Sequence, residues 1–125
     1  MNNLSVMLIE DNCDDAELAV MALKKAGIAA ISIARDGQEA IQMLMGESDT
    51  VLPDLILLDL KLPKMHGREV LRRIRADERT RFIKVAVLTS ADDPQSRQAC
   101  HDLAVAAYLT KPLAITDAQW KKLLV

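Results

Sequence analysis

Aromatic residues, cysteines and long apolar runs are all scarce in this chain of 125 residues. Phe82, Tyr108 and Trp120 are its only aromatic residues, so the core must be built from aliphatic side chains. The two cysteines, Cys13 and Cys100, fit neither a metal-ligand spacing nor a disulfide framework, and we expect free thiols in a reducing cytoplasm. No signal-peptide pattern opens the chain, and no apolar stretch approaches the roughly 18 residues that a membrane-spanning helix needs. The sequence therefore predicts a cytoplasmic protein with no membrane partner.

An excess of charge of one sign is also missing. The chain carries 16 basic and 18 acidic residues, interleaved along its length, for a formal net charge of −2. Such a balance gives no sign of the basic surface that attracts nucleic acids, so we expect no nucleic-acid partner. Half of the residues are apolar, and the length suits one ordinary domain, which we expect to span residues 1–125.

Short apolar runs alternate regularly with amphipathic segments. The apolar runs predict strands at residues 6–9, 30–34, 55–58, 83–88 and 106–109. Helical spacing predicts helices over about 14–26, from 37 past 44, over about 68–75, from 94 onward and over 114–124. Gly27 is expected to end the first helix, and Asp93 followed by Pro94 to begin the fourth. The pattern indicates an α/β fold, in which helices cover both faces of a parallel sheet.

Polar residues follow four of the predicted strands at the point where each strand ends. Glu10 and Asp11 follow the first strand, and Asp59 ends the third. Thr89 follows the fourth strand, and Lys111 follows the fifth. Because ligands of open parallel sheets bind outside the carboxyl ends of the strands, we expect these side chains to share one crevice.

The residue types indicate the chemistry of such a crevice. Three carboxylates repel one another unless a cation lies among them, and a sparse oxygen-only site suits Mg²⁺. A carboxylate nucleophile, a metal ion, a lysine and a hydroxyl together supply the positioning and charge stabilisation that phosphoryl transfer needs. Taken singly, each residue is better explained as a helix cap or a loop residue. Their joint occurrence at successive strand ends favours the functional interpretation.

Four motifs resemble those of the receiver domains of response regulators in two-component signalling. They are Leu8–Asn12, Leu57–Gly67, Val87–Ala91 and Tyr108–Pro112, and the resemblance extends over essentially the whole chain. It implies an α/β fold with a doubly wound, flavodoxin-like, five-stranded parallel sheet of strand order 2-1-3-4-5. It also implies that Asp59 is the phosphoacceptor.

The resemblance implies a metal site around this acceptor. Asp11 would bind Mg²⁺ directly, and Glu10 would assist through water. Asp59 and the backbone carbonyl of Lys61 would be further ligands.

A switch that reports phosphorylation is implied as well. Thr89 and Lys111 would contact the phosphoryl oxygens, and Tyr108 would be the aromatic residue whose rotamer follows the state of Thr89. The peptide bond from Lys111 to Pro112 would be cis, a form essentially confined to proline.

The partners of such a module are proteins. The donor would be a histidine kinase or a histidine phosphotransfer protein. The switched surface would contact a downstream protein target, or a second copy of the chain through the fourth helix, fifth strand and fifth helix. Residues 10–15 and 59–64 resemble the small stand-alone receivers of phytochrome-type histidine kinases. The chain would not be an enzyme beyond accepting and losing its own phosphoryl group.

Some features depart from the family pattern. Ala104 stands where many receivers have glycine before the fifth strand. A left-handed conformation costs alanine about 1 kcal/mol, so we expect a different turn there. The predicted final helix is short and ends at Val125, so we expect a reduced surface where it meets the fourth helix and the fifth strand.

Two other classes of protein are weaker explanations. Hydrolases of the haloacid dehalogenase type also use an aspartyl nucleophile, but they carry a second Asp where this chain has Lys61, two residues after Asp59. A receiver-like interaction module that is never phosphorylated would have lost an acid or the lysine. Glu10, Asp11, Asp59 and Lys111 are all present, which favours a phosphoacceptor.

Overall fold

The computed structural model describes residues 4–46, 51–63, 65–89, 94–111, 113 and 123. Some sequence predictions fall outside these residues. They are the helix over 114–124, apart from Leu123, the cap Asp93, and the cis peptide bond between Lys111 and Pro112. Among the described helices, none has the length and apolar character that crossing a bilayer would require.

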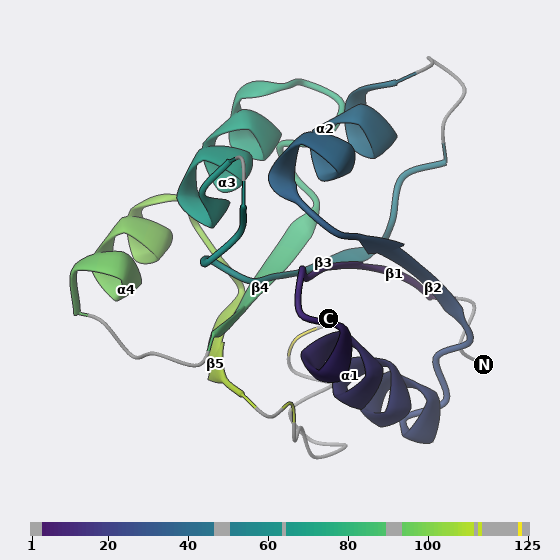
Figure 1. Ribbon diagram of the computed structural model, residues 1–125. Coiled ribbons are helices and arrows are strands. Elements are labelled where there is room, and N and C mark those ends of the chain that lie inside the picture. Colours follow the sequence, from purple (N-terminus) through teal and green to yellow (C-terminus); the bar gives the residue numbers. More distant parts are fainter. Residues whose placement is uncertain are drawn as a thin grey trace.

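Five parallel strands form one sheet at the centre of the molecule (Figure 1). They are β1 (Ser5–Ile9), β2 (Ala30–Ala34), β3 (Leu55–Leu58), β4 (Lys84–Thr89) and β5 (Ala107–Thr110). Their order is β2-β1-β3-β4-β5, and every neighbouring pair is parallel. The predicted doubly wound fold of order 2-1-3-4-5 is therefore confirmed.

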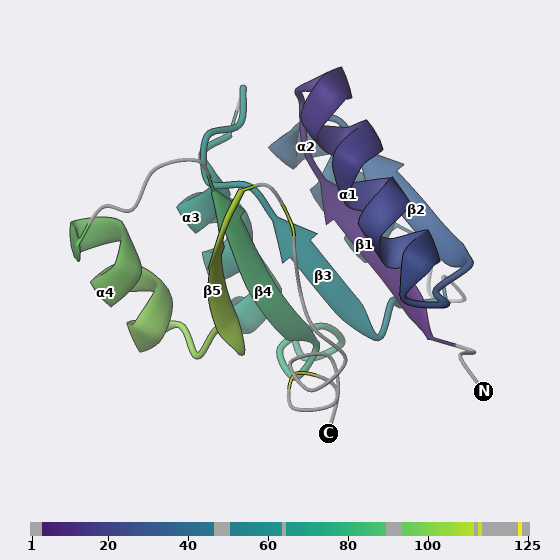
Figure 2. The same cartoon turned by 90° about the horizontal axis from the view of Figure 1, so that it is seen from below.

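Four helices among the described residues cover the two faces of this sheet. They are α1 (Cys13–Lys25), α2 (Gly37–Met45), α3 (Gly67–Ala76) and α4 (Pro94–Asp102). α1 lies on one face, as Figure 2 shows, whereas α2, α3 and α4 pack on the other. The strand order reverses between β1 and β3, and ligands of doubly wound sheets bind beside the carboxyl ends at such a point.

Side chains of the central strand β3 alternate between two buried cores. Ile56 and Leu58 share a cluster with residues of α2 and α3, while Leu55 and Leu57 share one with residues of α1. All four are fully buried. Burial of an aliphatic side chain of this size contributes about 1.5–3 kcal/mol. The strand is thus fixed from both sides, and so is Asp59, which follows it directly.

Helices α1 and α4 both end with a residue in the left-handed conformation. Gly27 has a φ of 90°, as expected for its predicted role, and Ala104 has a φ of 57°. The N–H of Ala104 donates to the carbonyl of His101, and the N–H of Val105 donates to the carbonyl of Cys100. These are the two bonds of a Schellman motif. The expectation of a different turn at Ala104 is therefore wrong, because the alanine adopts the conformation that glycine favours.

The side chain of Arg75, at the end of α3, holds this turn in place. Its Nε donates to the carbonyl of Leu103 at 2.8 Å, and one Nη donates to the carbonyl of Ala104 at 3.1 Å. The other Nη donates to the carbonyls of Ile83 at 2.7 Å and Arg81 at 3.0 Å. Hydrogen bonds from a charged group contribute about 1.5–3 kcal/mol, which offsets the cost of about 1 kcal/mol at the alanine.

Candidate functional site

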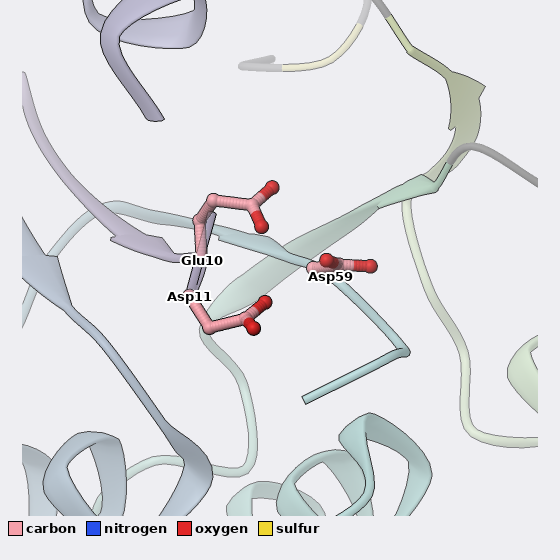
Figure 3. Close-up of side chains that lie close together, drawn as sticks. All are labelled: Glu10, Asp11 and Asp59. Carbon is pink, nitrogen blue, oxygen red and sulfur yellow. The ribbon is translucent and has the colours of Figure 1, made fainter. Parts of the chain in front are cut away.

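Three carboxylates meet at the carboxyl ends of β1 and β3. Figure 3 shows Glu10 and Asp11 extending from the end of β1 on the side of Asp59, which follows β3. One carboxylate oxygen from each of the three residues lies within 4.8 Å of the other two. Glu10 is 1% exposed and Asp59 is 5% exposed, whereas Asp11 is exposed to solvent. The three predicted acids therefore form one cluster, open on the side of Asp11.

The backbone around Asp59 is fixed on both of its sides. Its N–H donates to the carbonyl of Ile9 at 3.1 Å, and its Oδ1 accepts from the N–H of Lys61 at 3.1 Å. Behind it, the N–H of Gly67 donates to the carbonyl of Leu60 at 3.0 Å. A Cβ on Gly67 would lie 2.5 Å from the carbonyl oxygen of Asp59, so only glycine allows α3 to start this close to the strand.

Glu10 and Asn12 are ordered by the transition from β1 to α1. The N–H of Glu10 donates to the carbonyl of Ala34, which extends the pairing of β1 with β2 by one residue. Its Oε2 accepts from the N–H of Asn12 at 3.2 Å. The Asn12 side chain in turn accepts from the N–H of Asp15 and caps α1. The acidic loop is therefore bonded to both neighbouring elements.

Lys111, which follows β5, contacts three carboxylates at once. Its Nζ lies 2.5 Å from Oε1 of Glu10, 2.9 Å from Oδ2 of Asp15 and 3.1 Å from Oδ2 of Asp59. The lysine side chain is only 11% exposed. Its N–H donates to the carbonyl of Thr89 at 2.8 Å, which joins the ends of β4 and β5. The predicted lysine therefore contacts the carboxylate of the predicted phosphoacceptor.

The crowding of these charges shifts two pKa values. Burial raises the pKa of Glu10 to about 7, and the Asp59 carboxylate acts in the same direction, against the opposing effects of Lys111 and the N–H of Asn12. Burial alone would lower the pKa of Lys111, but its bonds to Glu10, Asp15 and Asp59 outweigh burial and raise that pKa above its ordinary value. Glu10 is therefore easier to protonate than an ordinary glutamate, mainly because it is buried, whereas its carboxylate partners hold Lys111 in the charged form.

The donor set fits a hard divalent cation. Glu10, Asp11 and Asp59 offer only oxygen ligands, and their spacing allows one ion to bind among them. A cation bound here would favour the charged form of Glu10, which burial opposes. The predicted backbone ligand, the carbonyl of Lys61, belongs to a residue that adjoins this cluster, because the Lys61 N–H donates to Oδ1 of Asp59.

The two predicted switch residues lie on β4 and β5. Thr89 is the last residue of β4 and is 2% exposed. Tyr108 is partly buried on β5, and the guanidinium of Arg97 on α4 lies 4.7 Å from the centre of its ring. A backbone bond joins Thr89 to Lys111, which contacts Asp59, and the ring of Tyr108 on β5 contacts Arg97 on α4.

Asp15 is the site residue that the sequence analysis missed. The sequence gives it no separate role within residues 10–15, because its contact with Lys111 joins residues 96 positions apart. Its place in the first turn of a helix that starts beside Glu10 and Asp11 is the signal that points to it.

The two cysteines differ in their surroundings. Cys100 is buried in α4, and burial raises the pKa of its thiol. Cys13 is exposed, and the guanidinium of Arg35 lies 3.7 Å from its Sγ. Cys13 therefore lies beside a basic side chain, whereas Cys100 lies in the apolar core.

Comparison with known proteins identifies the family. A family model of the response regulator receiver domain matches residues 6–119. The probable methanogenesis regulatory protein FilR2 of Methanothrix harundinacea is 38% identical over 118 residues, which are 90% of this chain and 74% of that protein. The response regulator Rcp1 of a Synechocystis strain is 37% identical over 116 residues, which are 90% of this chain and 79% of that protein.

Solved structures agree with this assignment. The bacteriophytochrome response regulator RtBRR superposes with a TM-score of 0.84 at 34% identity, covering 100% of this chain and 80% of its own. The Mn²⁺-bound form of Rcp1 superposes with a TM-score of 0.80 at 35% identity, covering 95% of this chain and 88% of its own. The chain therefore belongs to the response regulator receiver family and is a receiver domain of two-component signalling.

Proposed function

We propose that Asp59 accepts a phosphoryl group from a histidine kinase or a histidine phosphotransfer protein. The observation that supports this most strongly is the contact of the buried Asp59 carboxylate with Lys111, inside a cluster that also holds Glu10 and Asp11. The lysine offers a positive charge to the incoming phosphoryl oxygens, and the flanking acids offer a place for a cation.

In the proposed transfer, a lone pair of an Asp59 carboxylate oxygen attacks phosphorus. The bond between phosphorus and the donor histidine nitrogen breaks, and its electron pair stays on that nitrogen. With the other ring nitrogen protonated, the histidine leaves as a neutral imidazole. Lys111 Nζ, which lies 3.1 Å from Oδ2 of Asp59, donates to the oxygens of the transferred group. The Lys61 N–H holds Oδ1, which keeps the carboxylate from rotating as it reacts.

Mg²⁺ is the cation that the oxygen ligands suit best. Glu10, Asp11, Asp59 and the carbonyl of Lys61 would hold it, and when bound it would neutralise charge on the phosphoryl oxygens. The Mn²⁺-bound Rcp1 structure, at 35% identity, supports a divalent ion in this fold.

The proposed output is a change of surface on α4 and β5. Thr89 would donate its hydroxyl to the phosphoryl group, and Tyr108 would change its rotamer in response. The bond between Lys111 and Thr89 and the contact of Arg97 with Tyr108 connect the site to α4. A downstream protein target, or a second copy of the chain, would read this surface. The similarity to bacteriophytochrome response regulators favours a phytochrome-type kinase as donor.

We further propose that residues 1–125 act as one receiver domain that catalyses only the gain and loss of its own phosphoryl group. The test is incubation with acetyl phosphate and Mg²⁺, followed by intact mass measurement. The wild type and the control Asp14→Asn, which removes an exposed acid of α1, should each gain one phosphoryl group. Asp59→Asn should gain none. An unmodified wild type would instead identify an interaction module that is not phosphorylated.

A further inference from the structure

Lys111 forms an ion pair with Asp15, which is not one of the three acids that could hold a cation. Oδ2 of Asp15 lies 2.9 Å from Lys111 Nζ, closer than the 3.1 Å to Oδ2 of Asp59. The cluster that could hold a cation consists of Glu10, Asp11 and Asp59, without Asp15. We propose that Asp15 is a positioning residue, which holds Lys111 over the acceptor carboxylate and thereby speeds the phosphorylation of Asp59.

The first turn of α1 places Asp15 for this task. Its N–H donates to the side chain of Asn12 at 3.0 Å, and the next N–H, of Ala16, donates to the carbonyl of Asn12 at 2.9 Å. Ala16 is buried against the sheet, which anchors the turn. The backbone of Asp15 is thus fixed before its carboxylate meets Lys111, so the ion pair does not depend on ordering a loop.

A third anchor matters because lysine is flexible. Its side chain has four rotatable bonds, and holding it in one conformation costs entropy. This cost weakens a contact with a single oxygen. Glu10 and Asp59 also attract Lys111, but their charge would be shared with any cation bound among them. Asp15 lies outside that group, so its attraction for Lys111 would remain undivided.

The side chain of Asp15 is 37% exposed, whereas those of Glu10 and Asp59 are 1% and 7% exposed. Replacement of Asp15 should therefore perturb folding little. Asp14, one residue earlier in the same turn, is exposed and has the same charge, so Asp14→Asn is the matched control. This inference rests on the proposed function, because it concerns the rate of the same reaction.

The experiment measures the rate of modification by acetyl phosphate over a range of donor concentrations, with saturating Mg²⁺. Asp15→Asn should lower the maximal rate about threefold to tenfold, a range appropriate for a partly exposed ion pair. Its Mg²⁺ affinity should stay within about twofold of the wild type, since Asp15 lies outside the metal cluster. Asp15→Glu should restore part of the rate. The ammonium protons of Lys111, followed by ¹⁵N NMR, should exchange with water faster in Asp15→Asn than in the wild type or in Asp14→Asn.

Several results would overturn the inference. An Asp15→Asn rate equal to that of Asp14→Asn would remove the positioning role, and a faster rate would show that Asp15 competes for Lys111 instead. A loss of rate fully explained by weaker Mg²⁺ binding would assign the effect to the metal. If Asp15→Asn folds poorly, Asp15→Ser gives the same comparison. A wild type that gains no phosphoryl group refutes the proposed function itself, whereas a normal wild type with a normal Asp15→Asn refutes this inference only.

Discussion

The guanidinium of Arg75 donates a 3.1 Å hydrogen bond to the carbonyl of Ala104, the only non-glycine residue with a positive φ in the described part of the chain. Three further bonds from the same guanidinium reach the carbonyls of Leu103, Ile83 and Arg81. One side chain of α3 therefore fixes the turn between α4 and β5, next to the proposed output surface.

Ala104→Gly should stabilise the protein. Glycine adopts a φ of 57° without the steric cost that alanine bears, so we expect the free energy of unfolding to rise by about 1 kcal/mol. Urea denaturation measures this change. Ala76→Gly, at the exposed C-terminal end of α3, is the control and should destabilise instead. A destabilised Ala104→Gly would mean that the alanine methyl group makes contacts that outweigh the strain.

Arg75→Lys should be destabilising although the charge is kept. Lysine cannot reach several carbonyls from one planar group, and the carbonyls left without a donor should cost about 1–3 kcal/mol. Arg73→Lys, on the exposed side of the same helix, should change stability by less than about 0.5 kcal/mol. Hydrogen exchange should also quicken at the amides of Ala104 and Val105 in Arg75→Lys. Unchanged exchange at these amides would contradict the role of Arg75 in fixing the turn.

The stability of the metal-free protein should fall as the pH rises from about 4.5 to 7. Glu10 has a folded-state pKa raised to about 7 from an ordinary 4.5, so the folded protein holds this proton more tightly than the unfolded chain. The stabilisation from protonated Glu10 is complete below the unfolded pKa and is lost as the pH passes the folded pKa. It amounts to about 3 kcal/mol. Denaturation in EDTA at several pH values measures this loss. Glu10→Gln should lack it, and an equal slope in that variant would assign it to other groups.

Lys61→Ala should shorten the life of the phosphorylated protein. Lys61 is exposed two residues after Asp59, and its N–H is bonded to the acceptor carboxylate. A long cationic side chain at this place can cover the phosphoryl group against water, so its removal should speed decay about threefold. Decay of the adduct with Mg²⁺ present is the measurement, with Lys24→Ala at the far end of α1 as control. Equal decay in both variants would make Lys61 a solvated loop residue.

The sheet and the acidic cluster were predictable because they depend on local sequence. Apolar runs such as Leu55–Leu58 end in a polar residue, and parallel strands gather such ends at one edge. The first helix begins at Cys13 rather than near residue 14, since Asn12 is the residue that caps it. Boundaries of this kind depend on the cap chosen among neighbouring polar residues.

The contacts of Asp15 and Arg75 could not be read from the sequence. Asp15 meets a residue 96 positions away, and Arg75 meets the carbonyl of a residue 29 positions away. Both contacts depend on the rotation of a helix about its axis and on the path of a distant loop. The turn at Ala104 was predicted wrongly for the same reason, because the compensating guanidinium comes from another helix.

The sequence distance between the site residues also sets an order of assembly during synthesis. Glu10, Asp11 and Asp59 leave the ribosome long before Lys111, which is 52 residues beyond the acceptor. A nascent chain that extends only through β4 carries the acids of the site without the lysine that contacts them. Such a chain therefore lacks the positive charge that contacts Glu10, Asp15 and Asp59 in the folded protein, and with it the group proposed to receive the phosphoryl oxygens.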